Sequence, residues 1–61
     1  MEQSFIGLSK KSAQDLADRM NFIFRLVSVN GEPYLGKPED CRNDRICIDI
    51  TDGKVSAAVI Q

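Results

Sequence analysis

The longest polar connection in this 61-residue chain is the segment 30–45, NGEPYLGKPEDCRNDR, which separates two segments rich in β-branched and aromatic residues. The first of these, 22–29, is short and nearly continuously apolar, which predicts a strand covered on both faces. The second, 45–50, alternates strictly and predicts a strand that turns Ile46, Ile48 and Ile50 toward the core. Because a crossover between parallel strands needs about a dozen residues or more, we expect the two strands to be parallel.

Apolar residues recur at helical spacing in the segment before the first strand. Ala13, Leu16, Ala17 and Met20 fall at i, i+3, i+4 and i+7, which predicts a helix over about 10–20 with Ser9 as its N-cap. An Asp-Gly pair at 52–53 predicts a tight turn into a last antiparallel strand over 55–60. The expected fold is therefore α+β, a single small domain over 1–61. One helix packs on a three-stranded mixed sheet, with a long exposed loop over 30–44 and a C-terminal hairpin.

Charge and composition exclude several function classes. The formal net charge is −1, so no global positive field is expected to bind nucleic acid. No apolar run is long enough for a signal-peptide core or a membrane span, which favours the cytoplasm. The chain has no histidine, and Cys41 and Cys47 are expected to be free thiols, so neither a metal site, a cofactor nor an enzyme active site is expected. A domain this small buries only about 60% of its unfolded surface, which makes self-association a reasonable expectation.

The order of these elements, together with two short motifs, resembles the potato inhibitor I family of serine-protease inhibitors and its bacterial I78-like relatives. The segment 6–13, IGLSKKSA, is similar to the family's Gly-Lys-Ser and the Glu-Glu-Ala that follows it at the helix start. The segment 42–46, RNDRI, is similar to the family's Arg-x-Asp-Arg-Val after the binding loop. The resemblance covers most of the chain. It implies a non-catalytic protein that binds a protease or another protein through its loop.

The resemblance also implies roles for particular residues. Arg42 and Arg45 would support the loop from below, and the partner would contact Lys37, Pro38, Glu39, Asp40 and Cys41. Glu39 would fill the specificity pocket of the protease, which would have to be cationic. Pro38 stands where the family usually has threonine, and Cys47 stands where the plant inhibitors have a further supporting arginine.

Two other functions remain open from the residues alone. An oligomer could bind a small anionic, nucleotide-like ligand, as a viral or mobile-element factor that sequesters a host signal would; its site would use Lys10, Lys11, Arg25, Arg42 and Arg45. Alternatively, the chain could be a structural subunit whose loop, including Pro33, Tyr34 and Leu35, packs inside an oligomer.

Overall fold

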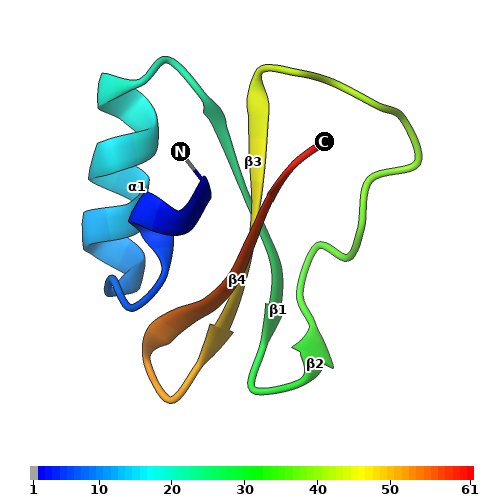
Figure 1. Cartoon of the computed structure of the whole chain (residues 1–61). Coiled ribbons are helices and arrows are strands. Elements are labelled where there is room, and N and C mark those ends of the chain that lie inside the picture. Colours follow the sequence, from blue (N-terminus) through cyan, green and yellow to red (C-terminus); the bar gives the residue numbers. More distant parts are fainter. Residues whose placement is uncertain (1) are drawn as a thin grey trace.

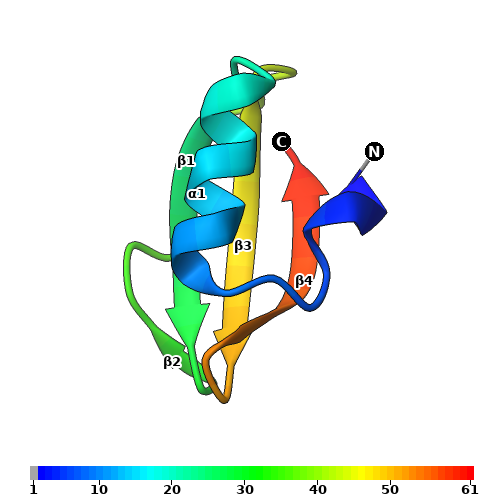
Figure 2. The same ribbon diagram turned by 90° about the vertical axis from the view of Figure 1, so that its left-hand side faces the viewer.

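The computed structural model describes residues 2–61 as two helices and a mixed sheet. In chain order the elements are the 3-10 helix η1 (Glu2–Phe5), helix α1 (Lys10–Arg19) and the strands β1 (Ile23–Val29), β2 (Glu32–Pro33), β3 (Arg45–Thr51) and β4 (Lys54–Ile60). Helix α1 covers one face of the sheet, and the long segment between β2 and β3 runs past the other face (Figure 1). The same layers appear in the view turned by 90° (Figure 2). The single domain expected over 1–61 includes Met1, which lies outside the described residues.

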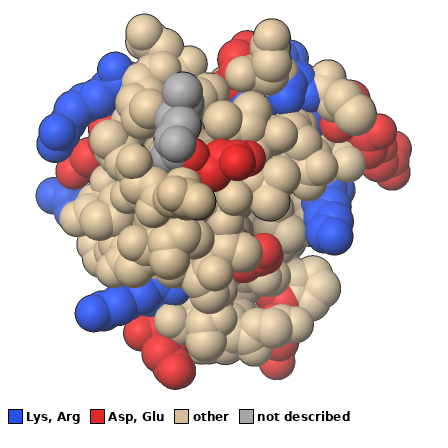
Figure 3. Space-filling model, viewed as in Figure 1, with Lys and Arg blue, Asp and Glu red and all other residues tan. Residues whose placement is uncertain are grey.

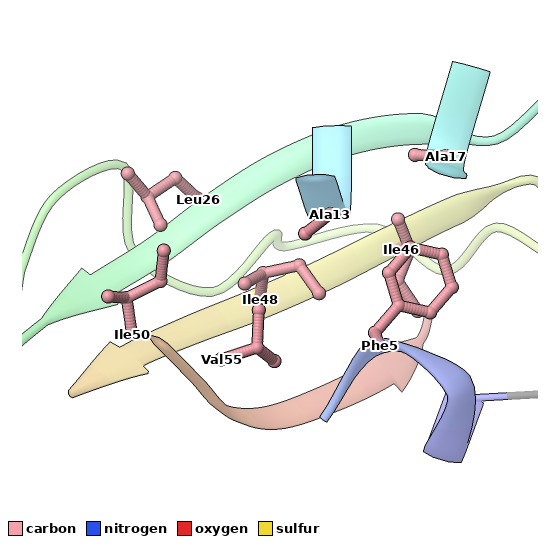
Figure 4. Close-up of a cluster of buried hydrophobic side chains, with 8 residues drawn as sticks. All are labelled: Phe5, Ala13, Ala17, Leu26, Ile46, Ile48, Ile50 and Val55. Carbon is pink, nitrogen blue, oxygen red and sulfur yellow. The ribbon is translucent and has the colours of Figure 1, made fainter. Parts of the chain in front are cut away.

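The core lies between α1 and the sheet. Ser9 caps the helix as predicted, since its hydroxyl accepts the N–H of Ser12 at 3.2 Å. Ala13 and Ala17 are fully buried, and their small side chains let the helix backbone approach the strands closely. Figure 4 shows these alanines together with the larger members of the cluster, which are Phe5, Leu26, Ile46, Ile48, Ile50 and Val55. The prediction that three alternating isoleucines of β3 face the core is confirmed.

The order of strands in the sheet is β2-β1-β3-β4. Strands β1 and β3 are parallel, with Ile23 opposite Arg45 and Arg25 opposite Cys47, so the predicted crossover is confirmed. Strands β3 and β4 form the predicted antiparallel hairpin. Asp52 and Gly53 both have positive φ, 51° and 79°, as a type I′ hairpin turn requires.

The expected three-stranded sheet is wrong, because the sheet has four strands. Asn30 and Gly31 adopt φ of 53° and 81° and turn the chain back, so that Glu32 and Pro33 pair antiparallel with the end of β1. The physical reason is the Asn-Gly pair, the same type of turn signal as Asp52-Gly53. The first part of the long connection is therefore part of the sheet.

The boundaries of the other elements agree with the prediction within two residues, and the helix ends at Arg19. No helix within residues 2–61 is both long and apolar enough to cross a membrane.

Candidate functional site

The candidate site is the segment 34–44, which connects β2 to β3 across the sheet face opposite α1 (Figure 1). Two arginines rise from that face, because Arg25 and Arg45 occupy strand positions that alternate with core residues. Each arginine holds a different part of the segment. The loop is therefore fixed at both ends by side chains from below.

Arg25 of β1 holds the first part. Its Nε donates to the carbonyl oxygen of Gly36 and its Nη2 to that of Leu35, both at 2.9 Å. This planar fork fixes two successive carbonyls in one orientation. The sequence predicts a role for Arg25 only in the alternative anion site. A charged residue within an apolar strand is nevertheless expected to face away from the core, which is the side on which the loop lies.

The register of β1 and β3 explains why Arg25 can support the loop. Arg25 pairs with Cys47 on β3, the position at which the resemblance would place a further supporting arginine. Cys47 itself is buried, only 4% exposed, and contributes no side-chain hydrogen bond to the loop. The neighbouring strand β1 thus supplies the guanidinium that β3 lacks at position 47.

Arg45 of β3 holds the second part. Its Nη2 donates to the backbone oxygen of Gln61 at 2.7 Å, to the carbonyl oxygen of Asp40 at 3.2 Å and to the carboxylate of Asp40 at 3.0 Å. The Arg45 side chain is only 9% exposed, while that of Asp40 is 63% exposed. Arg45 therefore lies beneath the loop, where the resemblance would place a supporting arginine, and its hydrogen bonds tie the loop to the end of the chain after β4.

The contact with Arg45 also favours the ionised form of Asp40. The hydrogen bond from Arg45 favours the ionised carboxylate, which lowers the pKa of Asp40, and the backbone of Asp40 adds to this effect. Buried Nε of Arg45 has no hydrogen-bond partner among residues 2–61. The guanidinium thus uses one nitrogen, Nη2, for all of its loop contacts.

Arg42 differs from the expected loop support. Its Nε and Nη2 donate to the two carboxylate oxygens of Asp44 at 2.7 and 2.8 Å, in a bidentate pair on the surface. This hydrogen-bonded pair lowers the pKa of Asp44 and raises that of Arg42. Only the backbone of Arg42 contributes to the loop anchor, through its N–H to the oxygen of Gln61 at 3.2 Å.

Most side chains at the tip of the loop face solvent. Lys37, Glu39 and Cys41 are exposed and Pro38 is half-buried. The side chain of Asp40 is 63% exposed although its carboxylate bonds to Arg45. The backbone bends at 39–40, so that Glu39 presents an exposed carboxylate at the bend.

The residues of the alternative anion site are not brought together in a single chain. Lys10 and Lys11 lie exposed on α1, which covers the sheet face opposite the loop that Arg25 and Arg45 contact (Figure 1). In the view of Figure 3 the Lys and Arg side chains lie in separate places, over α1 on the left and over the loop side on the right. An anion site built from several copies of the chain stays a prediction.

The remaining chemistry of the site is limited. Cys41 is exposed and Cys47 buried, and both are free thiols as expected. Within residues 2–61 there is no group of three or more His, Cys, Asp or Glu side chains that could hold a metal ion.

Comparisons with known proteins do not identify a function for the chain. No protein-family model matches the chain, and neither the curated proteins nor the solved structures contain a match.

Proposed function

We propose that the chain is a non-catalytic module that binds a protein partner through the segment 36–44, in the manner of a small serine-protease inhibitor. The observation that carries the proposal is the double anchorage of an exposed loop by Arg25 and Arg45. A loop held in one conformation loses little conformational entropy on binding, so more of its contact energy appears as affinity. The same anchorage would keep the two ends of the loop in place if a protease cut it.

The side chains at the tip define the kind of partner. Glu39 is exposed at the loop tip and pairs with no cation in the described residues, whereas Asp40 is already paired with Arg45. The partner therefore has a cationic recess that receives Glu39. Among serine proteases this is the class that cleaves after glutamate.

Inhibition of a panel of purified serine proteases tests the proposal. The panel contains one enzyme that cleaves after glutamate, one that cleaves after lysine and arginine, and one that cleaves after aromatic residues. We expect the chain to inhibit the first, and Glu39→Lys to lose that inhibition and inhibit the second instead. Gln14→Ala on the exposed side of α1 is the matched control and leaves inhibition unchanged.

Two results would contradict the proposal. Inhibition that is the same for the wild type and Glu39→Lys would show that Glu39 does not enter the pocket. Inhibition of no member of the panel would also contradict it, and rapid cleavage of the loop, seen by mass spectrometry, would then make the chain a substrate instead of an inhibitor.

The two other functions predict different observations. A ligand that binds only the folded protein raises its melting temperature, so a screen of mono-, di- and cyclic nucleotides tests the anion binder. Light scattering over a range of concentrations tests the structural subunit, because that function requires an oligomer. The separate positions of the basic residues in Figure 3 give no support to an anion site within one chain.

A further inference from the structure

Among residues 2–61, the most exposed large apolar residues are two neighbours just before the loop tip. Tyr34 is 65% exposed and Leu35 is 56% exposed. They follow β2 directly and lie on the same connecting segment as Glu39. Single exposed apolar residues are common on protein surfaces, whereas contiguous apolar patches mark interaction sites.

The backbone beneath these two residues is the most firmly held part of the loop. The N–H groups of Tyr34 and Gly36 donate to the carbonyl of Val27 at 2.8 and 3.1 Å, and the N–H of Leu35 donates to the carbonyl of Leu26 at 3.2 Å. Arg25 holds the carbonyls of Leu35 and Gly36. The two apolar side chains therefore project from a fixed backbone, as binding anchors do.

The loop tip alone is too small and too polar to form a stable interface. The exposed side chains of the tip belong to Lys37, Glu39, Asp40, Cys41, Arg42 and Asn43. A specific protein interface buries about 800 Å² on each partner, with apolar anchors at its centre. That area is about a fifth of the 4087 Å² surface of this chain, so the interface must extend beyond the tip.

We infer that Tyr34 and Leu35 form the apolar anchor of the same interface and that the partner is a protein with an apolar patch beside its basic recess. This inference rests on the proposed function, because the loop tip and the anchor are contacted by one partner. A hollow of about 350 Å³ beside Tyr34, lined also by Val29, Asn30, Glu32 and Pro33, receives a side chain of that partner. Glu32 carries a carboxylate that forms no ion pair within residues 2–61, so a basic side chain fits the hollow.

Alanine substitution with a matched control tests the inference. The probe is the serine protease that cleaves after glutamate, with its nucleophile replaced by alanine, so that titration calorimetry reports binding without cleavage. We expect Tyr34→Ala and Leu35→Ala each to weaken binding by about 10-fold or more, as truncation of interface anchors does. Ile6→Ala is the control, because Ile6 is similarly exposed, at 48%, but lies next to η1 and outside the loop.

The outcomes separate this inference from the proposed function. Loss of affinity in both loop variants but not in Ile6→Ala, with melting temperatures unchanged, supports the anchor. If Glu39→Lys abolishes binding while Tyr34→Ala and Leu35→Ala bind like the wild type, the anchor is wrong and the proposed function stands. If the wild-type chain does not bind the inactivated protease, both the apolar anchor and the proposed function are wrong.

Discussion

Replacing Arg45 by methionine isolates the hydrogen bonds that hold the loop, because methionine keeps most of the buried aliphatic stem. The bond from Nη2 to the Gln61 oxygen at 2.7 Å has a charged donor and contributes about 1.5–3 kcal/mol. The longer bond to the carbonyl oxygen of residue 40, at 3.2 Å, contributes about 0.5–1.5 kcal/mol. The contact with the exposed carboxylate is left out of the sum, because solvent screens it.

The substitution also removes an unfavourable group. The buried Nε–H of Arg45 has no partner within the described residues, and burying such a donor costs about 1–3 kcal/mol. Taken at the middle of each range, the difference leaves Arg45→Met less stable than the wild type by about 1 kcal/mol. For a domain of this size, that lowers the melting temperature by about 4–8 °C.

Thermal unfolding followed by circular dichroism measures the change, with Arg45→Ala and Arg42→Ala as companions. Arg45→Ala also loses two buried methylene groups, Cγ and Cδ, at about 0.8 kcal/mol each, and melts lower than the methionine variant. Arg42→Ala removes only a surface pair and leaves the melting temperature nearly unchanged. An Arg45→Met variant as stable as the wild type would refute the role given to these hydrogen bonds.

Three further predictions concern other parts of the molecule. Arg25→Ala frees the carbonyls of the first part of the loop, and limited proteolysis should cut the loop faster than in the wild type. Ala17→Leu overfills the fully buried contact between α1 and the sheet and should lower stability by about 1–3 kcal/mol in chemical denaturation, whereas Gln14→Leu on the exposed side should not. The hydrogen bond from Arg45 lowers the pKa of Asp40 below its ordinary value of 3.8 in the folded chain. The contact therefore stabilises the fold above pH 3.8, and this stabilisation is lost as the pH falls through the folded pKa of Asp40. An NMR titration of the carboxyl carbon checks this, and a midpoint at or above 3.8 would contradict it.

Local patterns in the sequence predicted the elements that depend on burial. The helix followed from the spacing of Ala13 and Ala17, and the register of β3 followed from its alternating isoleucines, because one face of each element must be apolar. The parallel pairing followed from the length of the connection alone.

The short strand β2 was missed although it has a local signal. The Asn30-Gly31 pair marks a hairpin, but Glu32 and Pro33 do not resemble strand residues, and a proline fits only an edge strand because it lacks a donor. The turn, and not the strand composition, would have revealed the pairing.

The loop supports were predicted only in part, because side-chain bonds to distant carbonyls leave no pattern in the sequence. Arg25 bonds to carbonyls that are far along the chain, so only the strand register reveals its role. Arg42 has a carboxylate nearby in the chain, and Asp44 competes successfully for its guanidinium. That competition was visible in the sequence, since the two residues flank a single asparagine.

The central claim is that the loop is already ordered before any partner binds. Backbone amide order parameters from ¹⁵N relaxation of the free protein, over the segment 34–44, test it most directly. The anchorage by Arg25 and Arg45 predicts values of about 0.8 or higher, close to those of a rigid backbone such as β1 and β3, falling toward flexible values in Arg45→Met. Values below about 0.6 across the loop of the wild-type protein would contradict the account, because such a loop is flexible on the nanosecond timescale and gains nothing from the arginines beneath it.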